Sequence, residues 1–187
     1  MKHSTKPPRC LNELLASASP SAAERARRWT ETRRAVLEIC PHLIDDLTHE
    51  LASRDLRIFC SALDLFYFRG AFGSTFEREI NPVFCWRVEE MDMPIEGVMK
   101  HEHEDNNHYF EVHVSRAFLV RKFGDRRGPV QARGHVVRDP LDAVLGVILH
   151  MMLHGIALGN TESTDEMERL DDFLTDRLFP GGQAPRA

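Results

Sequence analysis

One stretch constrains the fold more than any other, the run DPLDAVLGVILHMMLHGIALGN from Asp139 to Asn160. Asp139 suits the N-cap of a helix and Pro140 its first residue, while Gly159 and Asn160 suit the C-cap. The residues between them are apolar almost all round, and a helix without a polar face is buried. The run carries Asp142 and is short for a membrane span, so the sequence predicts a core helix.

Two histidines, His150 and His154, lie four residues apart within this predicted helix. That spacing places both imidazoles on one face, as in an H-E-x-x-H helix that offers two nitrogens to one zinc ion. Here the pattern reads H-M-M-L-H, so Met151 replaces the glutamate that would activate water. We interpret the pair as zinc ligands without a catalytic base. The alternative is a pair of core histidines, each hydrogen-bonded to a neighbour.

The composition narrows the class of protein. With 42% hydrophobic and 28% charged residues in 187, the chain is typical of a globular protein, and a net charge of -5 argues against nucleic-acid binding by the whole surface. The four cysteines are far apart and form no C-x-x-C pair, which is typical of reduced residues in an intracellular protein. No apolar segment follows the basic N-terminus, so we expect a nuclear or cytoplasmic protein that is not secreted.

Hydrophobic periodicity divides the rest of the chain into helices, short strands and a last helix. Apolar residues recur at helical spacing over residues 22–40 and 42–68, with a break near Ser53 to Asp55. Strand patterns follow at Pro82–Val88, Ile95–Met99 and His108–Val114. The sequence therefore predicts an α+β fold with a small, mostly antiparallel sheet. We expect a single domain over 22–179, with its core at 54–160, between disordered tails at 1–21 and 180–187.

Local signals predict where several of these elements begin, end and face. Ser21 with Glu24, and Ser163 with Glu166, match the capping box that starts a helix. Glycines after the aromatic segment LDLFYFRGAFG are expected to stop the second helical region. In the last strand, apolar residues alternate with polar ones and are predicted to face the core; they are Phe110, Val112 and Val114.

A basic segment, VRKFGDRRGPVQARGHVVRD, separates the last strand from the core helix. It reads as a long loop, either a solvated connector or a DNA contact. A DNA contact would use a set of cationic side chains, Arg121, Lys122, Arg126, Arg127 and Arg133. A groove that binds a protein or peptide is a further alternative, and no membrane partner is expected.

The order of these elements resembles the SprT-like family of zincin metallopeptidase-fold proteins. The aromatic and glycine-rich segment LDLFYFRGAF at 63–72 is similar to the end of an early family helix. The tryptophan-containing strand Val83 to Val88 and the strand and serine turn FEVHVSRAFL occur in the family's order. The helix LGVILHMMLHGIAL resembles the metal helix. The resemblance spans Arg54 to Leu158.

The resemblance implies a zincin-like domain that holds zinc in a groove beneath an edge strand. By position, His150 and His154 match the first two zinc ligands, and Met151 stands where the family has its catalytic glutamate. The family's third histidine has no counterpart, because no histidine follows His154. An acidic residue can replace it, and the candidates are Glu162, Asp165 and Glu166, which are equally suited to stabilise a helix start.

These features leave three functions open. The first is a SprT-like protein with impaired hydrolysis, related to proteins that in eukaryotes act in the nucleus on proteins crosslinked to DNA. The second is an active hydrolase with a rearranged site, in which Glu111 or Glu162 is the base. The third is a peptide- or DNA-binding module with structural histidines. Separately, His101 and His103 are candidate metal donors, although the turn residues Asp105 to Asn107 favour a charged hairpin tip.

Overall fold

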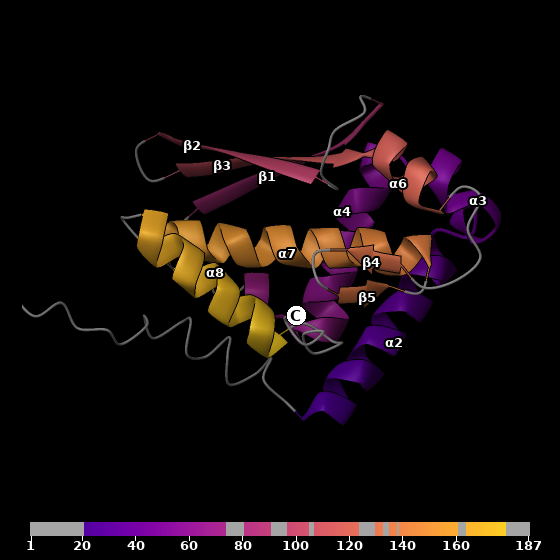
Figure 1. Cartoon of the computed structure of the whole chain (residues 1–187), viewed down its shortest axis with the longest axis horizontal. Helices are drawn as coiled ribbons and strands as arrows, with labels where there is room; N and C mark the ends of the chain where they lie inside the picture. Colours follow the sequence, from indigo (N-terminus) through magenta and orange to yellow (C-terminus); the bar gives the residue numbers. More distant parts are fainter. Residues whose placement is uncertain are drawn as a thin grey trace, which may run out of the picture.

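The structure is a computed structural model that describes residues 21–73, 81–90, 97–104, 107–123, 130–132, 135–137, 139–160 and 164–178. These residues form an α+β fold in which the long helix α7 (Pro140–Asn160) runs beneath a small sheet (Figure 1). The predicted tails lie outside the described residues, apart from Ser21.

Among the described residues, the helices that precede the sheet include α2 (Ala22–Ile39), α3 (Leu43–Glu50), α4 (Ser53–Ala62) and the π-helical η1 (Leu63–Tyr67), which continues α4. The Ser21 hydroxyl accepts a hydrogen bond from the Glu24 amide at 3.3 Å, which confirms the predicted N-cap. The predicted break lies just before Ser53, at Leu51 and Ala52.

A tight turn ends the second helical region at the predicted glycines. Arg69 and Gly70 adopt left-handed backbone conformations, with φ angles of 59° and 77°. Glycine adopts this conformation without the steric cost of a Cβ atom. The Asp64 carboxylate then accepts hydrogen bonds from the backbone amides of Phe72 at 3.0 Å and Gly73 at 3.2 Å, which fixes the turn.

The sheet consists of β1 (Asn81–Glu89), β2 (Gly97–Glu104) and β3 (Asn107–Ser115) in the order β1-β3-β2. Strand β3 runs antiparallel to β2 but parallel to β1, so the sheet is mixed and the prediction of a mostly antiparallel sheet is wrong. The reason is that β2 adds to the far edge of β3 instead of pairing with β1. The side-chain pattern of a strand specifies which face is buried, but not which strand lies beside it.

The two faces of the sheet differ as the alternation in β3 predicts. Phe110, Val112 and Val114 are buried on the face toward the helices, whereas Tyr109 is exposed on the other face. Trp86 of β1 is also buried. These side chains join the residues of α7 in one core cluster, so the buried face of the sheet packs against α7.

The basic segment is folded over part of its length, which corrects the prediction of a long loop. It contributes the second half of α6 (Arg116–Phe123) and a short antiparallel hairpin of β4 (Val130–Ala132) and β5 (His135–Val137). Buried Phe118, Leu119 and Phe123 anchor α6. The cationic groups of Arg121 and Lys122 each lie 5.5 Å from the centre of the Phe118 ring. The remaining predicted DNA contacts lie outside the described residues; they are Arg126, Arg127 and Arg133.

Helix α7 is the core helix that the sequence predicts. The Asp139 carboxylate caps it by accepting a hydrogen bond from the Asp142 amide at 2.9 Å. The prediction that Gly159 and Asn160 cap the C-terminal end of this helix is wrong, because both residues lie within the helix. By length and composition the segment also suits a membrane span, but 83% of this apolar stretch is buried inside the protein.

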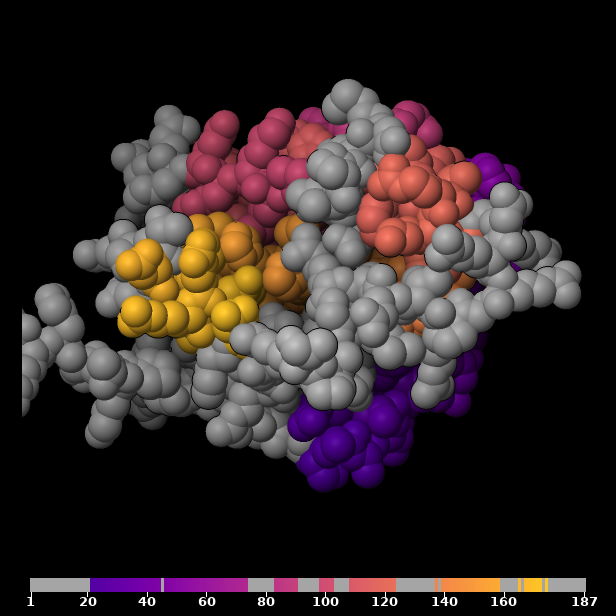
Figure 2. Space-filling model, in the orientation of Figure 1, coloured from indigo at the N-terminus to yellow at the C-terminus, as the bar shows by residue number. Residues whose placement is uncertain are grey.

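Two further helices position α7. Helix α8 (Thr164–Leu178) packs along it, and Figure 2 shows orange α7 surface between yellow α8 and the strands. On α2, the Trp29 indole donates a hydrogen bond to Asp142 at 2.9 Å, and Arg33 forms an ion pair with Asp139 at 2.7 Å. These contacts fix the N-terminal end of α7. The predicted cap at Ser163 lies outside the described residues.

Candidate metal centre

Three side chains from α7 and α8 form a group with the composition of a metal site. They are His150, His154 and Asp171, and each offers a ligand atom within 4.8 Å of the others. The two imidazole rings lie side by side as predicted, with centroids 6.0 Å apart and an interplanar angle of 25°. Because α7 is buried against the sheet, the pair is held on a rigid element rather than on a loop.

Asp171 completes the group from the neighbouring helix. Its Oδ2 atom lies 3.2 Å from Nδ1 of His154 and 3.8 Å from Nε2 of His150. All three side chains are largely buried, with exposed fractions of 16% for His150, 27% for His154 and 15% for Asp171. A carboxylate in such surroundings costs free energy unless a donor or a cation compensates it.

The second carboxylate oxygen of Asp171 indicates what the group lacks. Oδ1 is buried and has no hydrogen-bond partner within the part of the chain that the structure describes. Oδ2, not Oδ1, lies near both imidazoles, so a cation held by the three side chains would contact Oδ1 if the carboxylate bound it through both oxygens. Two imidazole nitrogens and one carboxylate oxygen are also a ligand set that zinc uses in catalytic sites, where a fourth position stays open. The residues present therefore fit zinc.

Sequence analysis identified the two histidines but not the acidic residue. Asp165 is exposed in the first turn of α8 and is not in the group, and the side chains of Glu162 and Glu166 lie outside the described residues. The sequence feature that could have identified Asp171 is its position on α8 beside the apolar residues Leu170 and Leu174, of which Leu174 is fully buried. An acid at the border of a buried stripe needs a partner, whereas an acid in the first turn does not.

The residue at the base position, Met151, is directed into the core. It is 4% exposed and belongs to the main core cluster. Gly155, one turn later on the same side of α7, faces the sheet: a Cβ atom there would lie 3.4 Å from Cζ of Phe84 and 3.8 Å from Cε1 of Phe110. The position therefore presents a buried thioether between helix and sheet, with no group that accepts a proton at neutral pH.

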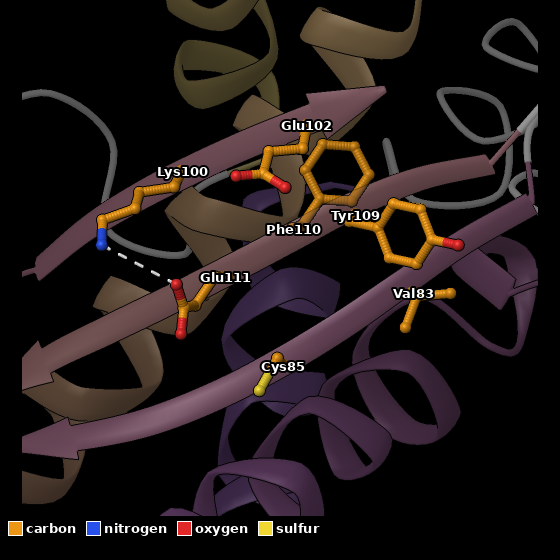
Figure 3. A pocket seen from close by; sticks show the side chains of 7 residues that line it. All are labelled: Val83, Cys85, Lys100, Glu102, Tyr109, Phe110 and Glu111. Carbon is orange, nitrogen blue, oxygen red and sulfur yellow. Dashed lines mark ion pairs between the residues drawn. The ribbon is translucent and has the colours of Figure 1, made fainter. Parts of the chain in front are cut away.

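Glu111, proposed above as a base in a rearranged site, lies on the opposite face of the sheet. It borders a hollow of about 110 Å³, where its carboxylate lies 3.8 Å from the Lys100 ammonium (Figure 3) and 2.6 Å from Arg87 Nε. The neighbouring His113 imidazole and the Arg87 guanidinium lower the pKa of Glu111. The structure does not bring this carboxylate to the histidine pair, so its assignment as the base is wrong.

A second cleft, of about 540 Å³, lies at the opposite end of α7 from the metal group. It is bounded by α2, α3 and the start of α7, and its lining includes Leu37, Leu47 and Leu141. The Arg33 to Asp139 ion pair lies at its edge. The cleft therefore contributes no residue to the histidine pair.

Comparisons with known proteins found no related protein. No family model, curated protein or solved structure matches this chain. The resemblance to SprT-like proteins therefore stays a prediction that depends on the residues described above.

Proposed function

We propose that the protein is a zinc-binding, SprT-like protein of the zincin class with impaired peptide hydrolysis. The observation that carries the proposal is the group formed by His150, His154 and Asp171, whose Oδ1 atom is buried without a partner among the described residues. The position of the sheet alongside α7 supports a zincin-like arrangement. The histidine spacing supports the same class.

The residues of this chain suit metal binding better than hydrolysis. The imidazoles of His150 and His154 would each donate a nitrogen lone pair, and Asp171 would donate a carboxylate oxygen from the neighbouring helix. Zinc in an active zincin polarises the peptide carbonyl and lowers the pKa of water. Met151 neither accepts a proton from water nor returns one to the leaving amine. General acid–base catalysis contributes about 10²- to 10⁴-fold to rate, so cleavage should fall by that order.

A protein with this site would hold a peptide without cleaving it efficiently. We therefore propose a protein or peptide as the partner, within a nuclear or cytoplasmic compartment. A DNA contact through the basic segment is a weaker candidate, since Arg121 and Lys122 lie against Phe118.

Metal analysis tests the binding half of the proposal. The full chain, purified without a histidine tag, should retain about one zinc ion per chain by mass spectrometry, and His154→Ala should lose it. His49→Ala is the matched control, because His49 is an exposed histidine on α3 that pairs with Asp46. A wild-type chain that binds no zinc after incubation with the metal would overturn the proposal.

A protease assay tests the catalytic half. The zinc-loaded protein should cleave casein no faster than buffer, and adding a chelator should change nothing, because no proton acceptor stands at position 151. Chelator-sensitive cleavage that is lost in His154→Ala would show that the protein is an active hydrolase.

A further inference from the structure

The cleft at the N-terminal end of α7 lies away from the histidine pair, and the proposed function does not use it. It is found where α2, α3 and the start of α7 meet, on the right in Figure 1. Its volume of about 540 Å³ is within the range of pockets that bind small molecules. The cleft is therefore large enough to hold an organic molecule.

The buried part of the lining is apolar. Leu43, Leu47, Phe123 and Leu141 line the cleft, and all four are buried residues of the main core cluster. Ile44 also lines it, but its side chain is 62% exposed. An apolar group that covered Ile44 and entered the cleft would remove apolar surface from water, which favours binding.

A fixed carboxylate lies at the wall formed by α3. The helix is interrupted at Asp46, whose backbone is non-helical with φ −147° and ψ 68°. The Asp46 carboxylate accepts hydrogen bonds from the Thr48 hydroxyl at 2.9 Å and from the His49 amide at 3.2 Å. Hydrogen bonds from the His49 ring and the Thr48 hydroxyl lower the pKa of Asp46, so the group is anionic at neutral pH.

The guanidinium on the other side of the cleft is already paired. Arg33 donates hydrogen bonds to Asp139 at 2.7 Å and 3.0 Å, and it also donates one to Asp142. Among the described lining residues, the carboxylates of Asp46 and Asp139 outnumber this guanidinium. The charges of the cleft therefore favour a cationic ligand over an anionic one.

We propose that this cleft binds small amphipathic cations, molecules that join an ammonium group to an apolar body. The ammonium would contact the Asp46 carboxylate, and the apolar body would lie against Leu47 and Leu141. A carboxylate oxygen accepts more than one hydrogen bond, so Asp46 can bind an ammonium and keep its contacts within α3. An anion of the same shape would meet the negative side of the cleft, which selects against it.

Calorimetric titration of the full chain at neutral pH tests this charge preference. The probes share one apolar body and differ in the head group: octylamine, 1-octanol and octanoate. We expect octylamine to bind about 5-fold more tightly than octanol, as for a partly exposed ion pair, and octanoate to bind more weakly than both. Added salt should reduce the advantage of octylamine, because salt screens exposed charges. Equal affinities for octylamine and octanol, or no binding of octylamine, would overturn the proposal.

Two variants locate the bound amine. Asp46→Asn removes the charge but keeps an acceptor oxygen for α3, so octylamine should bind no more tightly than octanol. Ile44→Arg places a cation beside the cleft and should weaken octylamine binding by about 5-fold. Asp172→Asn and Leu65→Arg are the matched controls, an exposed acid on α8 and a 60% exposed leucine on η1.

Circular dichroism verifies that each variant is folded. Both controls should bind octylamine as the wild type does. An unchanged affinity for octylamine in folded Asp46→Asn would overturn the proposal, because the ammonium would then bind elsewhere. Since neither variant touches the histidine pair, this result is independent of whether the protein binds zinc.

Discussion

Oδ2 of Asp171 lies 3.2 Å from Nδ1 of His154, which joins α8 to α7 across 17 residues of sequence. The candidate metal centre therefore depends on the packing of two helices, rather than on the histidine helix alone. Since Leu174 is fully buried in the same interface, apolar packing holds the carboxylate in place.

Replacing Asp171 should weaken zinc binding specifically. In Asp171→Asn the side chain keeps its size but loses its charge, so we expect zinc affinity to fall by at least about 10- to 100-fold. Competition with a chromophoric chelator measures the affinity. Asp165→Asn is the matched control, because Asp165 is an exposed acid on the same helix. Equal affinities for the two variants would show that Asp171 is not a ligand.

Zinc should also stabilise the fold. A ligand that binds only the folded chain at 100 times its dissociation constant adds about 2.7 kcal/mol to the free energy of unfolding. We therefore expect zinc to raise the melting temperature in differential scanning fluorimetry, and a chelator to reverse the change. His154→Ala should show no such response. An equal response in that variant would place zinc at other residues.

Local sequence patterns predicted the parts of the fold that depend on neighbouring residues. The apolar run after Asp139 identified the buried helix, and the alternation around Phe110 identified the buried face of β3. The histidine spacing brought His150 and His154 together, because four residues make about one helical turn.

Long-range relationships could not be predicted in this way. The pairing of β1 with β3 depends on how a connection crosses the sheet, and the strand patterns carry no information about it. The acid beside His154 depends on the docking of α8, whereas the acidic residues predicted from the sequence were Glu162, Asp165 and Glu166 near the helix start. The hydrogen bond between Nε2 of His101 and Nδ1 of His108, at 2.9 Å, joins residues that lie diagonally on β2 and β3, and the residue pattern alone does not specify that register.

Introducing a carboxylate at position 151 should destabilise the protein. Met151 is 4% exposed between α7 and the sheet, so Met151→Glu would bury an acid among apolar side chains. We expect a loss of about 2–4 kcal/mol in the free energy of unfolding, measured by urea denaturation. Met151→Leu nearly conserves volume and should cost less than about 1.5 kcal/mol. If Met151→Glu were as stable as wild type, its side chain would reach solvent or the metal centre, and the assignment of this position to the core would be wrong.

The N-terminal end of α7 should make stability depend on pH. Burial opposes ionisation of Asp139, but the hydrogen bond from Arg33 and those from backbone amides outweigh it, so the pKa of Asp139 is lowered. A carboxylate with a lowered pKa in the folded state stabilises the protein above its unfolded pKa of about 3.9, and that contribution is lost as the pH falls through the folded value. Asp139→Asn should therefore be less stable than wild type at pH 7, and the difference should shrink by about pH 3.

Two variants separate the charge of Asp139 from its role as a helix cap. Asparagine caps a helix about as well as aspartate, whereas alanine does not, so Asp139→Ala should lose about a further 0.5–2 kcal/mol at pH 7. That extra loss should persist at low pH, because it comes from the hydrogen bond to the Asp142 amide. Urea denaturation at both pH values measures both effects, with the exposed Asp172→Asn as control. A difference between wild type and Asp139→Asn that stays constant from pH 7 to pH 3 would mean that the ion pair with Arg33 does not stabilise the start of α7.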